Sequence, residues 1–368
     1  MSRIKVLHIL WSASMGGIGR VVINLCNAQL RNDHLSIGVL VAKSEGELLP
    51  QLKTLGIKIH EPRFIKGNDK SKEVLLNCKK TFEEYDILHF HSFNPTLANI
   101  AVKSKKKIIY TEHGNFAFGR EMTIKDYIVR YFQQNFLNKQ VDFITFNSAF
   151  SKNTSLKRFG LQKVKNKVVY NGCADLKKTI SISDFKRTKD EILITTIGRL
   201  AIVKRIDRLL NAYSLFGHYN SRLIIVGEGP LKEELENISR EKDITKDTVF
   251  TGIKESQSIL QISDICVFPS QNEAFGLVAI EAYQQGKPVI VFADGGGLPE
   301  LVNQIEPELI VNSESELAIL LEKMTKEIHL FNTEDKILLR KTFARRFTIE
   351  KMESELYSIY SEVFNVRN

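Results

Sequence analysis

Residues 173–199 read CADLKKTISISDFKRTKDEILITTIGR, and the change of pattern within this stretch decides the fold. Its first part, residues 173–191, is polar and follows neither the helical nor the strand period, which is typical of a linker. Its second part opens with ILITTI, residues 192–197, an apolar and β-branched run that predicts a buried strand. The stretch therefore separates two folding units and predicts a hinge near residues 172–191.

Strand-like runs alternate with helical stretches on both sides of this linker. The runs before it are IKVLHIL, LSIGVLVA, IKIH, DILHFH, KKIIYTEH, DFITFNS and KVVYNG, and those after it are ILITTIGR, RLIIVGEG, TVFTG, DICVFPS and KPVIVFA. Such alternation indicates open parallel sheets with helices on both faces. We therefore predict an α/β fold of two doubly wound, Rossmann-like domains, residues 1–172 and 192–347, joined by the linker 173–191. An amphipathic helix over residues 348–366, with Thr348 as its N-cap, is expected to pack back onto the first domain.

The composition excludes several classes of protein. The 368 residues suffice for two domains of ordinary size, and a hydrophobic content of 43% supports packed cores rather than disorder. No apolar run reaches the roughly 18 residues that a membrane span requires. The first residues lack the cleavage site of a signal peptide, and the four widely spaced cysteines form no CxxC pair. These features predict a cytoplasmic protein with free thiols.

The net charge is distributed unevenly along the chain. Residues 1–172 hold 27 Lys and Arg against 13 Asp and Glu, a net charge of +14, whereas the remainder holds 25 against 30. A basic half of this kind suggests a polyanionic partner, either nucleic acid or an anionic membrane surface. Because the sequence has no recognisable nucleic-acid-binding module, we expect no nucleic-acid partner.

Glu273 and Glu281 stand near the two ends of NEAFGLVAIE, residues 272–281. The pattern from Gly276 to Gln285 predicts a short helix, with Glu281 inside it and Glu273 in the preceding loop. Eight positions on a helix span roughly 12 Å, more than the roughly 5–9.5 Å between two carboxylates that act on one glycosidic bond. The pair therefore fits the two ends of a long ligand such as a nucleotide diphospho-sugar, whose anionic centre would lie at the helix N-terminus. The alternative is one solvated glutamate and one on a helix face.

Two further groups of residues follow predicted strands. Gly16, Gly17 and Gly19 lead from the first strand into a helix, as in a phosphate-binding turn, but they do not match the GxGxxG dinucleotide fingerprint. The alternative for them is an ordinary tight turn. Arg199 and Lys204 follow the strand ILITTI and could direct two cations at one diphosphate, or they could be a charged surface pair.

His113 ends the predicted strand KKIIYTEH, and His89 and His91 end the neighbouring DILHFH. An HxH pair suggests metal ligands, but no nearby carboxylate completes a triad, so we expect no metal site. The chain also lacks a DxD pair, the kind of acidic ligand that holds a divalent ion on a sugar diphosphate. We therefore expect Arg199, Lys204 and helix dipoles to neutralise the diphosphate, without a metal or any other cofactor.

An ordered set of short motifs extends over nearly the whole chain. In chain order they are GG, EHG, NG, GRL with a following K, VGEGP, FTG, FPS, E-x7-E, GKPVI and GGLPE. Each motif is weak alone, but the ordered set resembles glycosyltransferase family 4, whose members are retaining enzymes of the GT-B fold. The sequence departs from the family pattern at Arg205, where glycine is common, and at the triple glycine Gly295–Gly297, where two glycines are common.

The resemblance implies two domains that face a cleft, with the acceptor bound by residues 1–172 and the donor by residues 192–347. In the donor domain, Glu273 would bind hydroxyls of the donor sugar and Glu281 the ribose of the nucleotide. Arg199 and Lys204 would bind the diphosphate, with help from the backbone of Phe275, Gly276 and Leu277. The turn near the nucleotide base would be formed by Gly227, Gly229 and Pro230.

Four residues of the first domain also match the family. Gly16 and Gly17 would bring backbone amides near the donor phosphates or the acceptor, and His113 would lie beside the donor sugar. Asn171, followed by Gly172, would shape the hinge side of the cleft. The resemblance further implies front-face transfer of a hexose-type sugar, in which the leaving phosphate oxygen takes the proton of the acceptor, with a UDP-sugar favoured over a GDP-sugar as donor.

A basic and aromatic helix is predicted shortly after His113. Within FGREMTIKDYIVRYFQQNFLNKQ, apolar and basic side chains are interspersed: Met122, Ile128, Tyr131, Phe132 and Phe136 with Lys125, Arg130 and Lys139. Such a surface suits anionic lipid, and the alternative is an ordinary domain helix with solvated lysines. The first interpretation predicts a lipid-linked glycan acceptor of surface polysaccharide synthesis and peripheral attachment at the inner face of the membrane.

A non-catalytic nucleotide-sugar binding protein is the alternative function. It is disfavoured because Glu273, Glu281, Arg199, Lys204 and His113 are all present.

Overall fold

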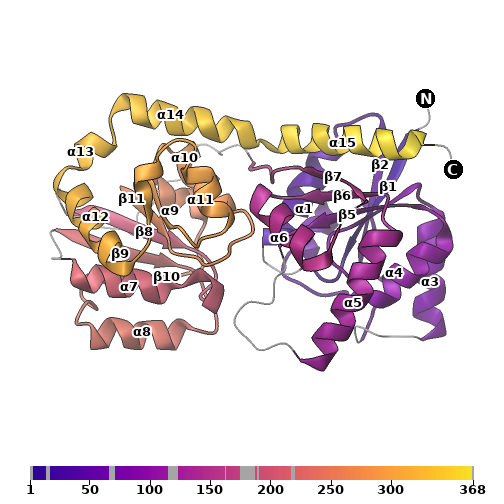
Figure 1. The fold of residues 1–368 in the computed structure, drawn as a ribbon, viewed down its shortest axis with the longest axis horizontal. Coiled ribbons are helices and arrows are strands. Elements are labelled where there is room, and N and C mark those ends of the chain that lie inside the picture. The colour runs from indigo at the N-terminus through magenta and orange to yellow at the C-terminus, as the bar shows by residue number, and fades with distance from the viewer. Residues whose placement is uncertain are drawn as a thin grey trace. The chain divides into compact units, whose positions relative to one another are not determined.

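The computed structural model describes residues 3–13, 17–65, 71–114, 123–161, 163–174, 187–188, 190–216 and 220–366. The chain forms two compact units, each with its own sheet (Figure 1). Unit 1 consists of residues 1–174 together with 348–368, and unit 2 of residues 175–347. Unit 2 is therefore an insertion in the sequence of unit 1.

Unit 1 is built on a seven-stranded parallel sheet with the order β3-β2-β1-β4-β5-β6-β7. The strands are β1 (Ile4–Leu10), β2 (Leu35–Val41), β3 (Lys58–His60), β4 (Ile87–Phe90), β5 (Lys107–Glu112), β6 (Phe143–Phe146) and β7 (Lys165–Val168). The strand order reverses between β1 and β4. In doubly wound sheets, ligands bind beyond the carboxyl ends of the strands at such a reversal.

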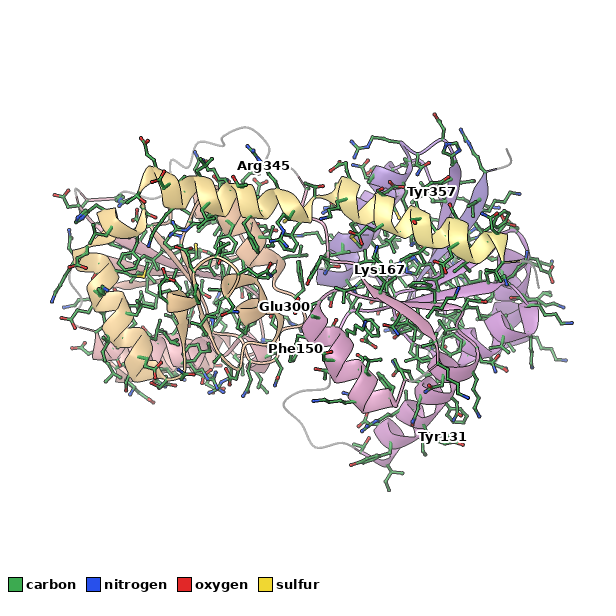
Figure 2. All side chains as sticks on the ribbon, turned by 45° about the horizontal axis from the view of Figure 1, so that its top comes forward. Tyr131, Phe150, Lys167, Glu300, Arg345 and Tyr357 are labelled. Atoms are coloured by element: carbon green, nitrogen blue, oxygen red, sulfur yellow. The ribbon has the colours of Figure 1, made fainter. Side chains whose placement is uncertain are left out.

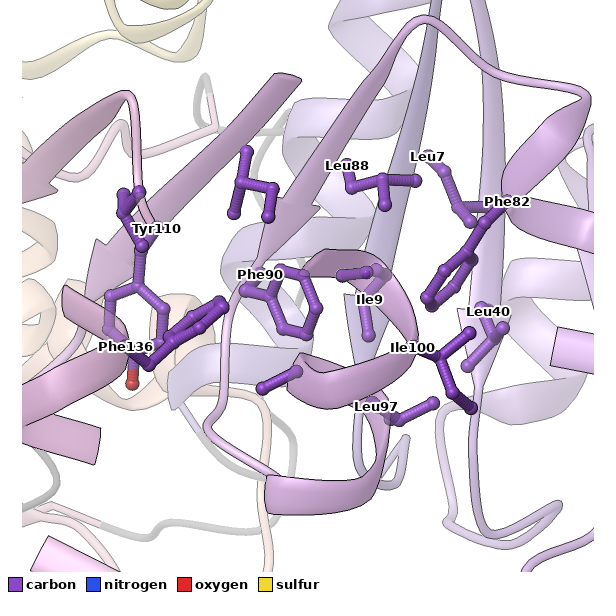
Figure 3. Packing of buried hydrophobic residues seen from close by; sticks show 14 of the residues in the cluster. Leu7, Ile9, Leu40, Phe82, Leu88, Phe90, Leu97, Ile100, Tyr110 and Phe136 are labelled. Carbon is purple, nitrogen blue, oxygen red and sulfur yellow. The ribbon is translucent and has the colours of Figure 1, made fainter. Parts of the chain in front are cut away.

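Helices cover both faces of this sheet. They are α1 (Gly17–Gln29), α2 (Leu49–Thr54), α3 (Lys72–Glu83), α4 (Pro95–Ser104), α5 (Ile124–Lys139), α6 (Ala149–Phe159) and α15 (Ile349–Asn365). Alternate side chains of β1 and β4 enter one core: Leu7, Ile9, Leu88 and Phe90 pack with Leu97 and Ile100 of α4 (Figure 3). The residues between them on β1 and β4, His8 and His89, are equally buried and therefore face the other side of the sheet.

Helix α15 belongs to unit 1, where it packs on α1 and β1. It begins at Thr348, whose hydroxyl accepts a hydrogen bond from the Lys351 amide at 3.2 Å, so the predicted N-cap is confirmed. Polar contacts also tie the helix to the rest of unit 1: Arg31–Glu350 at 2.9 Å, Asn32–Glu353 at 2.8 Å, Lys165–Glu362 at 2.9 Å and Lys167–Glu355 at 3.0 Å.

The chain leaves and re-enters unit 1 at neighbouring points. Cys173 and Thr348 form a parallel β-bridge, and the Gly172 amide donates to Sδ of Met352 at 3.2 Å. A Cβ atom on Gly172 would lie 2.5 Å from Cα of Ile349. Only glycine allows this close approach of the two backbones.

Unit 2 is built on a six-stranded parallel sheet with the order β10-β9-β8-β11-β12-β13. The strands are β8 (Ile192–Ile197), β9 (Ser221–Val226), β10 (Thr248–Gly252), β11 (Ile265–Phe268), β12 (Val289–Phe292) and β13 (Ile310–Val311). The order reverses between β8 and β11. The predicted α/β class with two Rossmann-like parallel sheets is thus confirmed.

The helices of unit 2 are α7 (Ile206–Leu215), α8 (Lys232–Glu241), α9 (Ser256–Ile262), α10 (Leu277–Gln284), α11 (Gly297–Val302), α12 (Glu314–Lys326), α13 (Ile328–Phe331) and α14 (Glu334–Ala344). Three short 3-10 turns accompany them: η1 (Ile202–Lys204), η2 (Pro307–Leu309) and η3 (Arg345–Phe347). Among the described residues, no helix is both long enough and apolar enough to cross a membrane.

Two edge strands differ from the prediction. β7 covers Lys165–Val168, a polar and half-exposed segment, rather than the more apolar run 167–172. β13 has only two residues and carries no strand pattern in the sequence. β7 is polar and β13 is too short to show a strand period, so neither gives the apolar alternation that a sequence pattern records.

A buried ion pair organises one end of unit 2. The Arg340 guanidinium is fully buried and donates from Nε and Nη2 to the two carboxylate oxygens of Glu306, at 2.8 and 2.5 Å. It also donates to the carbonyls of Gly286 and Phe331 and to Oδ1 of Asn332. All the guanidinium donors have partners, which is the condition under which a buried charge is tolerated.

Candidate functional site

A pocket lies at the carboxyl ends of β8 and β11, where the strand order of unit 2 reverses. Its empty space, including the part open to solvent, is about 250 Å³. The lining residues all come from unit 2: Thr196, Ile197, Gly198, Lys204, Ile206, Phe268, Pro269, Ser270, Glu273, Val278 and Leu298. Two of them, Lys204 and Glu273, are candidates from the sequence.

Lys204 and Glu273 form an ion pair inside this pocket. Nζ of Lys204 lies 2.5 Å from Oε2 of Glu273, and each side chain is 21% exposed. Lys204 ends the turn η1, which follows β8, and its stem runs along Gly198. The cation is therefore held at the strand end by a carboxylate that can also accept hydrogen bonds from a ligand.

Arg199 is the second residue after β8 and is exposed. Among the residues that the structure describes, it forms no ion pair or hydrogen bond through its guanidinium. Its charge is consequently available to an anion, whereas that of Lys204 is shared with Glu273. Of the two predicted diphosphate-binding cations, Lys204 is thus paired with a carboxylate, whereas Arg199 has no ion-pair partner among the described residues.

The loop that carries Glu273 is held by the three glycines 295–297. The Glu273 amide donates to the Gly295 carbonyl at 3.1 Å, and the Gly297 amide donates to the Glu273 carbonyl at 2.7 Å. A Cβ atom on Gly296, whose φ is +75°, would lie 2.4 Å from the Glu273 carbonyl oxygen. The triple glycine that departs from the family pattern therefore lets two backbones lie against each other and fixes the position of Glu273.

Helix α10 begins next to this loop. Its N-cap is Gly276 in the left-handed region, with φ +95°, and no side chain caps its first amides. Leu277 is its first residue, Phe275 is buried before it, and Glu281 lies half-buried on its second turn. The uncapped N-terminus can bind an anion through its backbone amides.

A second pair of loops meets at the ends of β8 and β9. The Leu200 amide donates to the Glu228 carbonyl at 3.0 Å, and a Cβ atom on Gly229 would lie 2.3 Å from the Leu200 carbonyl oxygen. Gly227 has φ +138° and would place a Cβ atom 1.9 Å from the Gly198 carbonyl oxygen. These glycines bring the turn at 227–230 against the loop that carries Arg199.

Arg205 occupies a position where the backbone favours glycine. Its φ is +46°, in the left-handed region, which explains why glycine is common there in the resembling family. Its guanidinium donates to both oxygens of Asp207 at 2.8 to 3.1 Å. Asp207 thus pairs with the Arg205 charge, and Arg205 is not among the residues that line the pocket.

The candidates from the first half of the chain lie in unit 1. Gly16 lies outside the described residues, and Gly17 is the first residue of α1. His113 is buried just beyond β5, and desolvation lowers its pKa to about 4. Asn171 is buried after β7, and its Oδ1 atom accepts no hydrogen bond from any described residue.

One residue that sequence reasoning missed is His8. It lies on β1 in register with His89 of β4, and its Nδ1 atom lies 2.9 Å from Nε2 of His91. Because β1 and β4 are far apart in sequence, only the strand order brings these histidines together. The one signal in the sequence is a polar residue at the centre of the apolar run IKVLHIL.

The basic and aromatic helix is α5, and its first half is exposed. Ile124 is 80% exposed and Tyr131 63%, and Tyr131 points away from the unit at the side of α5 (Figure 2). Met122 lies outside the described residues. Several cations of the basic first half of the chain are engaged within the fold. Arg130 of α5 donates to the Arg158 carbonyl at 2.8 Å, Lys106 donates to the Glu83 carbonyl at 3.1 Å, and Lys107 lies 3.8 Å from Asp142.

Comparison with known proteins gives two family models that match consecutive parts of the chain. The model described as Glycosyltransferase Family 4 matches residues 15–174, and the model described as Glycosyl transferases group 1 matches residues 177–332. The boundary between the two matches falls at the boundary between the sheets.

Similar sequences extend over the whole length of the chain. The "Uncharacterized 41.2 kDa protein in cps region" of Klebsiella pneumoniae is 27% identical over 97% of this chain and 99% of its own. The "O-antigen biosynthesis glycosyltransferase WclY" of Escherichia coli is 23% identical over 98% of this chain and 99% of its own.

A solved structure shares the fold. Alr3699/HepE of Anabaena, in complex with UDP and glucose, superposes with a TM-score of 0.80 at 18% identity and covers 98% of this chain and 100% of its own. The two parallel sheets, the two family models and the full-length glycosyltransferase relative all indicate the same family. The chain belongs to the glycosyltransferases of the GT-B fold.

Proposed function

We propose that this chain is a retaining glycosyltransferase of family 4 that transfers a hexose-type sugar from a nucleotide diphospho-sugar to a lipid-linked glycan in surface polysaccharide synthesis. The observation that carries the proposal is the edge of the second sheet, where the Lys204–Glu273 pair lies in the pocket and the uncapped N-terminus of α10 follows the same loop. The names of the E. coli relative and of the UDP-containing HepE structure support the pathway and favour a UDP-sugar over a GDP-sugar.

The positive groups in the pocket and in the adjoining loops suit a departing diphosphate. As the bond between the sugar carbon and the β-phosphate oxygen breaks, negative charge builds on that oxygen and positive charge on the sugar carbon. Arg199, which is exposed, and the backbone amides at the start of α10 stabilise the developing negative charge. Lys204 joins them when the diphosphate competes with Glu273 for its ammonium group.

Glu273 fits the sugar better than the bond-breaking step. It is the one carboxylate among the described residues that line the pocket, and it is already paired with Lys204. A double displacement would need a nucleophilic carboxylate and a separate acid, about 5–5.5 Å apart. We therefore infer front-face attack, in which the acceptor hydroxyl bonds to the sugar carbon and gives its proton to the leaving phosphate oxygen.

We infer that the reaction uses neither a metal nor another cofactor. A divalent ion on a diphosphate is held by carboxylates, whereas the one carboxylate among the described pocket residues, Glu273, is already paired with Lys204. Transfer is expected to continue in excess chelator. A rate that collapses in chelator and returns with Mg²⁺ or Mn²⁺ contradicts this part of the proposal.

We further infer that α5 attaches the enzyme to an anionic membrane surface at the inner face of the membrane, where a lipid-linked acceptor would be found. Exposed apolar side chains on the first half of the helix can enter the headgroup region: Ile124, Tyr127, Ile128, Tyr131 and Phe132. Lys125 on the same half adds an attraction to anionic lipid.

Two measurements test the transferase function. Thermal unfolding with UDP, GDP and their sugars identifies the nucleotide, because only a bound ligand raises the Tm. Transfer is then followed with the stabilising donor and membranes that carry lipid-linked glycan. Stabilisation by a UDP-sugar without nucleotide release at any acceptor concentration would support a non-catalytic binding protein instead.

A further inference from the structure

A line of buried side chains crosses the sheet of unit 1 at the point where its strand order reverses. It runs from Gln29, the last residue of α1, through His8 and His91 to His113, and we call it the histidine line. Oε1 of Gln29 lies 2.7 Å from Nε2 of His8, and Nδ1 of His8 lies 2.9 Å from Nε2 of His91. Nδ1 of His91 lies 3.0 Å from Nε2 of His113.

A second line starts from the same glutamine. Nε2 of Gln29 lies 3.3 Å from the Tyr360 hydroxyl on α15, which lies 2.7 Å from Nδ1 of His89. Nε2 of His89 lies 2.6 Å from Oγ1 of Thr111, and Thr111 lies 2.6 Å from Oγ1 of Thr145. The two ends of one side-chain amide thus contact two separate lines.

The imidazoles of both lines are neutral. Burial lowers the pKa of His8 and of His113 to about 4, and it lowers the pKa of His89 and of His91 well below the usual value. A neutral imidazole has one N–H donor and one nitrogen acceptor. Each ring must therefore donate at one nitrogen and accept at the other, so fixing one ring fixes the next.

Gln29 fixes the direction of the histidine line. Its Oε1 atom can only accept, so Nε2 of His8 carries the proton and donates to it. Nδ1 of His8 then accepts from Nε2 of His91, and Nδ1 of His91 accepts from Nε2 of His113. The single proton of His113 consequently lies on Nε2, and its Nδ1 atom has a lone pair.

In the second line, every contact can likewise be assigned one donor and one acceptor. Nε2 of Gln29 donates to the Tyr360 hydroxyl, which donates to Nδ1 of His89. Nε2 of His89 then donates to Thr111, whose hydroxyl donates to Thr145. Each donor has one acceptor throughout both lines, which is how a buried polar network becomes stable.

A metal centre is the competing interpretation of these histidines. Ring nitrogens of His8, His89 and His91 all lie within 4.8 Å of one another. Two nitrogens that bind one tetrahedral zinc ion at about 2.0–2.1 Å lie roughly 3.3 Å apart. The 2.9 Å between His8 and His91 is a hydrogen-bond distance, and all six ring nitrogens of the three residues have hydrogen-bond partners. The geometry therefore favours the hydrogen-bonded network.

We propose that Gln29 is a positioning residue that acts through His8 and His91 to hold His113 as its Nε2–H tautomer, so that Nδ1 of His113 accepts a hydrogen bond from a sugar hydroxyl. This rests on the proposed transferase function. No described residue hydrogen bonds to Nδ1 of His113, and the Asn147 amide holds the His113 carbonyl at 3.4 Å. His113 lies beyond the carboxyl end of β5, the edge at which ligands of such sheets bind.

The tautomer decides which ligand group His113 can recognise. A ring nitrogen with a lone pair accepts from a hydroxyl but repels a carbonyl or phosphate oxygen. The opposite tautomer would reverse that preference. A hydroxyl in contact with His113 is thus selected by a glutamine two rings away that does not touch the ligand.

Nitrogen-15 NMR of histidine-labelled resting protein tests the tautomer directly. Long-range couplings distinguish a protonated from a bare ring nitrogen, and we expect Nε2–H on His8, His89, His91 and His113. In Gln29→Leu, which keeps the volume but removes the acceptor, the signals of His113 should shift toward a mixture of tautomers. Tyr360→Phe is the matched control, because it breaks only the second line and should leave His113 unchanged.

Transfer assays provide the functional measurement. Gln29→Leu should lower kcat/KM about tenfold, the effect of one weakened hydrogen bond, while Tyr360→Phe remains near wild type. Gln29→Glu keeps an acceptor for His8 and should keep the His113 tautomer, which provides a second variant if Gln29→Leu does not fold.

Three results would overturn the proposal: Nδ1–H on His113 of the wild type, equal NMR shifts in Gln29→Leu and Tyr360→Phe, or stoichiometric zinc bound to these rings in the purified protein. An Nε2–H tautomer that depends on Gln29, in a protein that binds sugar nucleotides but transfers nothing, would instead sink the proposed function alone.

Discussion

The ammonium group of Lys204 lies 2.5 Å from the carboxylate of Glu273, in a pocket where each side chain is about one-fifth exposed. The lysine that would bind a diphosphate is therefore neutralised before the ligand arrives. An anionic ligand must share Lys204 with Glu273 or displace the carboxylate toward the sugar. This competition separates the role of Glu273 in binding from its role in transfer.

Glu273→Gln should strengthen the binding of UDP and weaken transfer. Removal of the carboxylate charge frees Lys204 for the phosphates, and a partly exposed ion pair of about 1 kcal/mol corresponds to roughly fivefold tighter binding. The loss of a charged acceptor for the sugar should lower kcat at least about tenfold. Calorimetric titration with UDP and steady-state transfer rates measure the two effects. Glu322→Gln, which removes an exposed Lys–Glu pair on α12, should change neither.

Glu281→Ala should weaken the binding of UDP even without the sugar. Glu281 lies on the second turn of α10, whereas Glu273 lies in the loop before that helix. A ribose hydroxyl bonded to the Glu281 carboxylate would contribute about 1.5–3 kcal/mol. The same calorimetric titration should show a loss of about tenfold or more. An equal loss in Glu281→Ala and Glu273→Gln would contradict the separate roles of the two glutamates.

Gly296→Ala should damage both stability and activity. The new Cβ atom would lie 2.4 Å from the Glu273 carbonyl oxygen, on a backbone with φ +75°, so the loop that carries Glu273 must move. Gly56→Ala separates the two effects, because Gly56 has φ +72° but no atom within 4 Å of its Cβ position. We expect about 1 kcal/mol of destabilisation without loss of transfer in Gly56→Ala, and both losses in Gly296→Ala. Normal kcat in Gly296→Ala would show that this loop does not position the catalytic residues.

The buried histidines should make unit 1 sensitive to acid. The pKa of His8 and of His113 is lowered to about 4 in the folded state, whereas the unfolded chain titrates near 6.5. The unfolded state binds the additional protons, so their stabilisation is fully present above about pH 6.5 and is lost as the pH falls toward 4. Each histidine contributes up to about 1.4 kcal/mol per pH unit to the free energy of unfolding in that window. Urea unfolding between pH 7 and 4.5 should show this slope, and His8→Asn should reduce it by one histidine's share.

The first half of α5 should bind vesicles that contain anionic lipid. Each exposed cation near such a surface contributes about 1 kcal/mol, and exposed aromatic side chains add apolar burial. Replacing Tyr131 and Phe132 by serine should reduce sedimentation with these vesicles at all salt concentrations. Lys103 on the neighbouring α4 and Lys105 at its C-cap are exposed, as is Lys125 on α5. Replacing these three lysines by serine should reduce sedimentation mainly at low salt, because salt screens exposed charges. Lys254→Ser, an exposed lysine of unit 2, serves as the control. Equal retention by neutral vesicles would contradict an electrostatic contribution.

Much of the fold was predictable because apolar periodicity records burial. The strands β8 and β11 are buried and central in their sheet, so they give unbroken apolar or β-branched runs, and the sequence predicts them closely. Edge strands β7 and β13 carry little apolar pattern and were misplaced or missed. The pattern reports apolar burial along a segment, so it fails where a strand is polar, as in β7, or only two residues long, as in β13.

Part of the candidate site could likewise be predicted from the sequence, and part of it could not. Short motifs placed Lys204 and Glu273 in one pocket because strand ends meet where the order reverses. The contact between His8 and His91, and the buried pair of Arg340 with Glu306, join residues that are 83 and 34 positions apart. No local pattern encodes such pairs, since they depend on which elements become neighbours.

The insertion of unit 2 between Ala174 and Thr348 sets an order on synthesis. A ribosome releases every strand of both sheets before it releases α15, which contributes Tyr360 to the core of unit 1. During translation, unit 2 can therefore complete its structure while unit 1 still lacks its last helix. A premature stop codon after residue 347 would leave the second half of the gene's product intact and would destabilise the first, so the lesion and the failing domain would lie at opposite ends of the reading frame.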